Sequence, residues 1–135
     1  MFQFALKLRV RYSDTDQMGF VYYGNYAAYY EVARVEAFRS IGYSYKKLEE
    51  SGIGMPVLDM TSLYHAPAKY DDLLNITVKI TEMPKARIRY LYEIHNEEGI
   101  LLNTGTTSLA FINLTNGRPV KMPEHLKELI APYFS

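Results

Sequence analysis

The sequence of 135 residues contains no cysteine, which excludes disulfides, thiol nucleophiles and most structural zinc sites. It also lacks a long apolar run, because Lys7, Arg9 and Arg11 interrupt its start, MFQFALKLRVRY. We therefore expect neither a signal peptide nor a membrane span, and a cytoplasmic location. Net charge is absent as well, since fifteen basic residues balance fifteen acidic ones. The overall charge thus gives no indication of binding to nucleic acid or to a membrane.

Several catalytic signatures are missing too. There is no glycine-rich nucleotide fingerprint and no P-loop, and the segment GYSYK lacks the second glycine of a nucleophile elbow. The three histidines, His65, His95 and His125, are too far apart in sequence for the spacing of a metal site. We expect no metal and no cofactor.

The composition that is present indicates a folded domain. A hydrophobic fraction of 48% in 135 residues predicts one globular domain, spanning residues 1–135. Thirteen tyrosines are unusual. Their apolar rings and polar tips suit ligand clefts and interfaces, although a tyrosine-rich core is an equally good interpretation.

Hydrophobic periodicity predicts an α+β fold. A helix of four to five turns is expected from Asn25 as N-cap to a stop at Gly42, with Arg34 and Arg39 outside its apolar stripe. A second, short helix is expected through YKKLEE after Ser44, and a terminal one starts at Pro123. Alternating or extended patterns predict five strands: 4–12, 55–65, 74–81, 87–95 and 101–114.

Short turns join the last four strands, so the sheet is expected to be antiparallel with one long helix on one face. One helix cannot cover five strands and leaves sheet edges open. The pattern therefore predicts an oligomer, at least a dimer.

Two acids precede the long helix in the segment YSDTDQMGFVYYGNY. Asp14 and Asp16 lie beside an apolar wall and close to the free N–H groups of a helix start, which can hold a developing oxyanion. The spacing alone fits a second interpretation equally well, in which both acids cap loop amides as Asx-turns.

Two further polar clusters accompany this segment. Tyr70, Asp71 and Asp72 form a second acidic turn at the entry to a strand, and KARIR brings Lys85, Arg87 and Arg89 within five residues. Such a basic cluster can bind phosphates, although a solvated strand face is the commoner explanation.

Taken together, the D-x-D at Asp14 and Asp16, the run from Gly19 to Tyr26 and the later YDD resemble the 4-hydroxybenzoyl-CoA thioesterase family of hotdog-fold enzymes. The resemblance implies an antiparallel five-stranded sheet wrapped around one long central helix. It also implies active sites at a dimer interface, in dimers or homotetramers.

The resemblance assigns roles to particular residues. Asp16 is implied as the catalytic carboxylate, either nucleophile or general base, and the backbone N–H groups of Tyr23 and Gly24 as oxyanion donors. Further implied contacts are Tyr22, Asn25 and Glu31 with the substrate, and Lys85, Arg87 and Arg89 with coenzyme A. Many relatives have a histidine where this sequence has Tyr23.

The predicted function is that of an acyl-CoA thioesterase, which hydrolyses an acyl-CoA thioester to the free acid and coenzyme A. Two alternatives stay open at this point. One is a thioesterase that takes its acyl chain from an acyl-carrier protein, and the other is a non-catalytic acyl-CoA-binding protein with the same fold.

Overall fold

A computed structural model describes the whole chain, residues 1–135. Its α-helices are α1 (Tyr26–Ser40), α2 (Tyr45–Glu50) and α3 (Glu124–Ile130). The strands are β1 (Phe2–Arg9), β2 (Ile53–Gly54), β3 (Val57–Tyr64), β4 (Leu73–Ile80), β5 (Arg87–His95), β6 (Leu101–Ala110) and β7 (Ile112–Asn113). Single 3-10 turns add η1 (Tyr12–Asp14), η2 (Tyr23–Asn25) and η3 (Ala131–Phe134).

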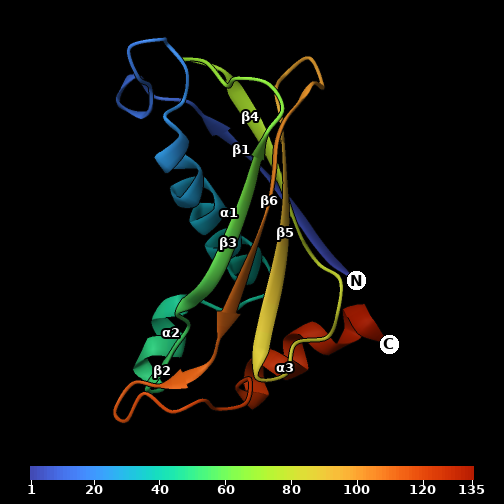
Figure 1. The fold of residues 1–135 in the computed structure, drawn as a ribbon. Helices are drawn as coiled ribbons and strands as arrows, with labels where there is room; N and C mark the ends of the chain where they lie inside the picture. The colour runs from blue at the N-terminus through green and yellow to red at the C-terminus, as the bar shows by residue number, and fades with distance from the viewer.

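Five of the strands form one antiparallel sheet in the order β1-β4-β5-β6-β3. The sheet curves around α1, which runs along its concave side (Figure 1). Short connections make β4, β5 and β6 neighbours, whereas β1 and β3 form the two edges. The predicted α+β hotdog architecture is therefore confirmed.

The core lies between α1 and the sheet. The apolar stripe predicted for the helix is buried, and so are the alternate residues of β4 and β5. The ring of Tyr30 stacks on that of Tyr92, with centroids 4.1 Å apart. Tyr30 also donates a hydrogen bond to Asn103, so its hydroxyl finds a partner on the opposite layer.

Three predicted details of the elements are wrong. The first strand ends at Arg9, which pairs with Leu73, the first residue of β4. Beyond this pair only the backbone bonds of Val10 with Asp71 and Asp72 link the two segments. Tyr12, the last residue of the predicted strand 4–12, is consequently exposed. The last strand, predicted to reach residue 114, stops at Ala110, and Phe111 turns into the core before β7 pairs with β2.

Arg34 is also wrongly predicted, because it lies inside the protein at 5% exposure. Its Nη1 donates to the hydroxyl of Tyr92 over 3.2 Å, and its Cζ lies 6.0 Å from the centre of the Tyr90 ring. The guanidinium is thus surrounded by aromatic rings, and no salt bridge to a carboxylate compensates its charge.

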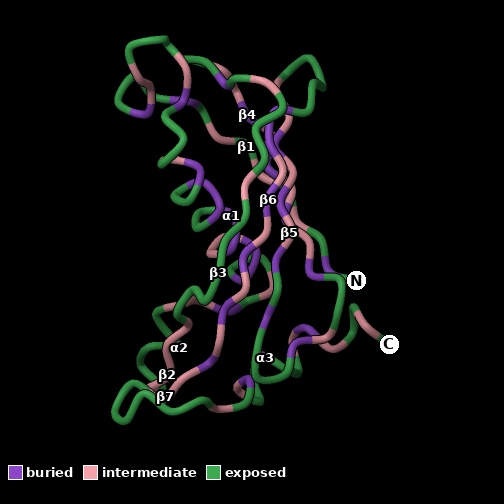
Figure 2. Tube along the Cα trace, viewed as in Figure 1, coloured by how far each residue is buried: buried purple, intermediate pink, exposed green.

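The strand β3 is the most exposed strand of the sheet (Figure 2). Its exposed side chains include large apolar ones: Val57, Leu58, Met60, Leu63 and Tyr64. An apolar, unpaired edge of this kind favours association with another chain. None of the helices has the length and apolar character needed to cross a lipid bilayer, and the cytoplasmic location stays a prediction.

Candidate active site

Asp14 is held as a structural residue. Its carboxylate is buried and Oδ2 accepts hydrogen bonds from the backbone N–H of Arg11 and from the hydroxyl of Tyr29, each over 3.0 Å. Burial, followed by the hydrogen bond to Asp14, raises the pKa of Tyr29. The carbonyl of Asp14 accepts from the N–H of Tyr22 and from the side-chain amide of Asn25. The loop-capping interpretation is therefore confirmed for Asp14, which fixes the loop to the start of α1.

Asp16 is held by only one of its two carboxylate oxygens. Oδ1 accepts from the N–H of Met18 over 2.9 Å and, more weakly, from that of Phe20 over 3.4 Å. A tight turn supports this arrangement, since Gly19 donates to the carbonyl of Asp16 and adopts a φ of 77°, which favours glycine. Asp16 therefore also caps loop amides, as the Asx-turn interpretation predicts, while its Oδ2 has no partner in the chain.

Asp16 opens onto a cleft of about 350 Å³. The lining is mostly apolar or aromatic: Met18, Phe20, Val21, Tyr23, Tyr26, Tyr64, His65, Ala66 and Pro67. The wall of such a cleft places the carboxylate directly against a bound substrate and keeps bulk water away from the reacting groups.

The predicted oxyanion donors lie next to this cleft. Tyr23 and Gly24 are the first two residues of η2, and α1 follows directly at Tyr26. The N–H groups at a helix start have no acceptor inside the helix, and the backbone gives these two none elsewhere. The ring of Tyr22 packs closely on Gly24, since a Cβ at this position would lie 2.8 Å from it.

The second acidic motif supports the first through its backbone. The N–H of Val21 donates to the carbonyl of Ala68 over 2.8 Å, and Phe20 forms an isolated bridge with Lys69. Asp72 stabilises this turn by accepting the N–H of Lys69, and Asp71 takes a φ of 69°. The YDD turn therefore positions the Asp16 loop and lies outside the cleft, which explains why the two motifs occur together.

The other predicted substrate contacts lie away from the cleft within one chain. Tyr22 is 47% exposed on the outside of η2, and Glu31 is exposed on α1. Asn25 occupies the N-cap position of α1, but its side-chain amide binds the carbonyl of Asp14 instead of capping the helix. Their contacts with a substrate remain predictions.

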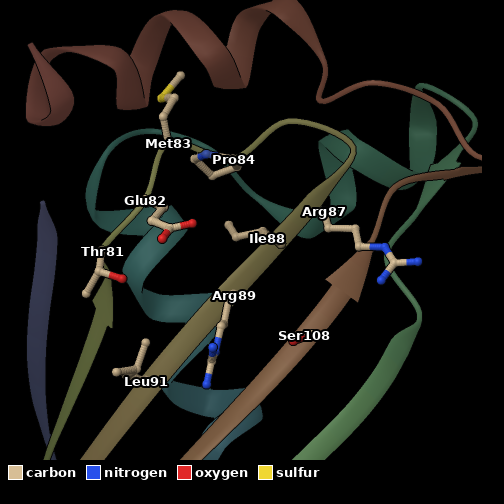
Figure 3. A pocket seen from close by; sticks show the side chains of 9 residues that line it. All are labelled: Thr81, Glu82, Met83, Pro84, Arg87, Ile88, Arg89, Leu91 and Ser108. Carbon is tan, nitrogen blue, oxygen red and sulfur yellow. The ribbon is translucent and has the colours of Figure 1, made fainter.

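The predicted basic cluster forms a second cavity, of about 350 Å³, on the outer face of the sheet. Arg87 and Arg89 alternate with buried residues on β5 and project from the same face, beside Glu82 and Ser108 (Figure 3). Neither arginine forms a salt bridge. Both guanidinium groups are thus available for an anionic ligand.

Lys85 lines an adjoining cavity of about 380 Å³ together with Lys121 and Lys127. The two cavities share Pro84. The backbone bond from the N–H of Met122 to the carbonyl of Lys85, 3.0 Å long, brings these distant segments together. Lys121 and Lys127 were not predicted to belong to the cluster, because only this tertiary contact places them beside it.

The structure contains no group of three or more histidine, cysteine or acidic side chains arranged to hold a metal ion. The polar groups at the cleft are a carboxylate, backbone N–H donors, tyrosine hydroxyls and one imidazole.

Comparison with known proteins gives the family. A sequence profile of the thioesterase-like superfamily matches residues 10–130. The acyl-CoA thioester hydrolase YbgC of Escherichia coli O157:H7 is 34% identical over 130 residues, covering 96% of this chain and 95% of that one. The putative acyl-CoA thioesterase YneP of Bacillus subtilis is 30% identical over 115 residues, covering 85% and 83% of the two chains.

Solved structures agree. The DHNA-CoA thioesterase of Staphylococcus aureus superimposes with a TM-score of 0.91 at 32% identity, covering 99% of this chain and 90% of that one. A 4-hydroxybenzoyl-CoA thioesterase in complex with its substrate has a TM-score of 0.84 at 22% identity over 96% and 99% of the chains, which supports the fold alone.

Fold and relatives together define a hotdog-fold thioester hydrolase. The chain belongs to the thioesterase-like superfamily, and the family and enzyme class predicted from the sequence are confirmed.

Proposed function

We propose that the protein hydrolyses acyl-CoA thioesters to the free acid and coenzyme A, with Asp16 as its catalytic carboxylate. One observation carries this proposal: a carboxylate oxygen without a partner, Asp16 Oδ2, and a residue at the start of a helical turn, Tyr23, line the same apolar cleft. Relatives named as acyl-CoA thioester hydrolases over nearly the whole chain support the substrate class.

The reaction needs two things at the thioester carbonyl. The N–H groups of Tyr23 and Gly24, at the positive end of the helix dipole, stabilise the negative charge that develops on the carbonyl oxygen. Asp16 either attacks the carbonyl carbon itself or removes a proton from an attacking water. Both routes break the C–S bond and release the coenzyme A thiolate. Activated water gives the free acid directly, whereas direct attack leaves an anhydride on Asp16 that a water molecule then hydrolyses to the free acid.

The phosphates of coenzyme A are assigned to the basic cluster of Lys85, Arg87 and Arg89. Two observations support this assignment. The guanidinium groups of Arg87 and Arg89 form no salt bridge within the chain, and the adjoining cavity is lined by three lysines, of which Lys85 is one. The lysines missed by the sequence analysis, Lys121 and Lys127, extend the same positive surface.

A single chain places the two halves of this site far apart. Tyr64, which lines the Asp16 cleft, is paired with Asn103 at one end of β6, whereas Arg87 is paired with Ala110 at the other. Asn103 and Ala110 are seven residue steps apart along β6, which corresponds to about 23 Å at the rise of a β-strand. Arg87 also faces the outer side of the sheet.

An antiparallel pairing of two β3 strands about a two-fold axis near Met60 would remove this separation. It would place Val57 of each chain opposite Tyr64 of the other, and so bring the partner's Arg87 to the end of the sheet where Asp16 lies. The exposed apolar edge of β3 supports such a dimer. The family resemblance extends it to a homotetramer of two dimers.

A panel of acyl-CoA substrates tests the proposed function. Purified protein should release coenzyme A from at least one short, branched, long or aromatic acyl-CoA, as measured with a thiol reagent. Binding without thiol release would indicate the non-catalytic alternative. Turnover only of the same acyl group on an acyl-carrier protein would indicate the carrier-protein thioesterase.

A further inference from the structure

The cleft that contains Asp16 also contains a histidine that the sequence analysis assigned no role. His65 follows the last residue of β3 and lines the cleft together with Tyr64 and Ala66. We propose that His65 is the proton donor to the sulfur of the departing thiolate. This inference rests on the proposed function and adds a second catalytic side chain to it.

Backbone contacts hold His65 at this place. Its N–H donates to the carbonyl of Leu102 over 2.9 Å, and the N–H of Ala66 donates to the same carbonyl over 3.1 Å. The imidazole is oriented by Thr104, whose Oγ1 lies 2.9 Å from Nε2. The threonine hydroxyl can donate to Nε2 or accept from it, so it supports either charge state of the ring.

The second ring nitrogen, Nδ1, forms no hydrogen bond within the chain. The side chain is exposed at the cleft rather than packed in the core. An imidazole fixed through one nitrogen, with the other free at the cleft, has the geometry of a general acid.

Acid strength selects the histidine over the other donors. A group that protonates the departing sulfur has to be a stronger acid than the thiol that forms. For comparison, the ordinary pKa of a cysteine thiol is about 8.5. Burial raises the pKa of Tyr26 in the same cleft to about 12, and an ordinary phenol titrates near 10. The remaining titratable cleft groups are Asp16, Tyr23 and Tyr64. Asp16 acts as the base or nucleophile, and the two tyrosines are phenols. The imidazolium of His65 is therefore the group in the cleft that fits the role of proton donor.

The proton balance of the step is simple. After Asp16 or its activated water has added to the carbonyl carbon, the oxyanion collapses and the C–S bond breaks. The electron pair of that bond goes to sulfur, which receives the proton from the imidazolium of His65. The products are the free thiol, a neutral imidazole and the acyl group, which leaves as the free acid on the water route or stays as an anhydride on Asp16 until water hydrolyses it. The imidazole takes a new proton from solvent.

His65 would thus supply the cleft with a histidine, although this sequence has Tyr23 at the position where many relatives have one. The two positions come from different elements, since Tyr23 begins η2 and His65 follows β3. Sequence spacing around the D-x-D motif cannot reveal a donor that the far end of another strand supplies.

A pair of thioesters with the same acyl group tests the proposal. One is the N-acetylcysteamine thioester, whose alkyl thiolate is a strong base and needs a proton. The other is an S-nitrophenyl thioester, whose thiol is a stronger acid than imidazolium and leaves unassisted. His65→Gln should lower kcat/KM at least about tenfold on the alkyl thioester and less than about threefold on the aryl one.

His95→Gln, at the end of β5, is the matched histidine control and should leave both substrates at the wild-type rate. Asp16→Asn should lose activity on both thioesters, so failure of the proposed function is seen separately. An equal loss on the two substrates in His65→Gln would show a merely structural role, and wild-type rates on both would exclude any role; either result overturns the proposal.

Discussion

At the scale of single residues, Asp14 and Asp16 show how neighbouring carboxylates acquire different roles. Asp14 is enclosed by the N–H of Arg11 and the hydroxyl of Tyr29, whereas Asp16 keeps one oxygen free at an apolar cleft. The D-x-D spacing reveals the pair but not this difference. Only the path of the loop, set by Gly19 and by the contacts with Ala68 and Lys69, decides which acid faces the cleft.

Arg87 should act on substrate affinity. Arg87→Ala removes a charge-assisted contact to phosphate, so we expect KM for an acyl-CoA to rise about tenfold while kcat changes little. Steady-state kinetics with the acyl-CoA and with the pantetheine thioester of the same acid measure this. The truncated substrate should show no change in KM, and Lys46→Ala, on α2, should behave like wild type. An unchanged KM for the acyl-CoA would show that the phosphates bind elsewhere.

Tyr92 makes the protein sensitive to alkali. Burial raises the pKa of its hydroxyl to about 12, although Arg34 works in the opposite direction. The native state therefore keeps this proton up to about pH 12, whereas the unfolded chain loses it near its ordinary value of 10. The stability linked to Tyr92 is complete below pH 10 and is lost as the pH rises toward 12.

The expected loss for this one tyrosine is at most about 3 kcal/mol of unfolding free energy. Urea denaturation at pH 9, 10 and 11 measures it, and Tyr92→Phe should show a smaller decrease over the same range. A stability that stays constant between pH 9 and 11 would contradict the burial of an un-ionised Tyr92.

At the scale of elements, the packing of α1 on β6 depends on Gly105. A Cβ at this position would lie 2.7 Å from the carbonyl oxygen of Thr61 and would collide with the hydroxyl of Tyr30. We expect Gly105→Ala to cost about 2–4 kcal/mol, since Tyr30 is held in the core and the Thr61 carbonyl belongs to the paired backbone of β3. Ser108→Ala, on the outer face of the same strand, should cost less than about 0.5 kcal/mol. Equal denaturation midpoints for the two variants would contradict this packing.

The elements were predictable where one residue pattern decides them. The two-residue period of β4 and β5 and the helical stripe of α1 match the observed buried faces. Errors occur where another segment decides. β1 ends at Arg9 because β4 begins at Leu73. Arg34 is buried because aromatic rings from other elements surround it, and its charged side chain gives no sign of this in the sequence.

At the scale of the whole molecule, the site is divided between the two ends of the sheet. The cleft with Asp16 could be predicted from one continuous segment. The contributions of His65, Lys121 and Lys127 could not, because each comes from an element that only the tertiary fold places near the site. The proposed completion of the site by a second chain rests on the same geometry.

Mixing an inactive variant with one of weakened substrate affinity tests the shared site. Asp16→Asn and Arg87→Ala, unfolded together and refolded at a one-to-one ratio, should recover about a quarter of the wild-type activity at low substrate concentration. Half of the dimers are then mixed, and one of the two sites in each carries both native residues. Activity no higher than the average of the separate variants would show that one chain supplies both groups.

The proposed role of Asp16 in the chemistry is tested by comparing Asp16→Asn with Asp14→Asn on the best acyl-CoA of the panel. Asp16→Asn should fold with wild-type stability and lose at least about a hundredfold in kcat. Asp14→Asn should instead lose about 1–2 kcal/mol of stability and keep kcat within a few-fold. Full turnover by a folded Asp16→Asn variant would contradict the account.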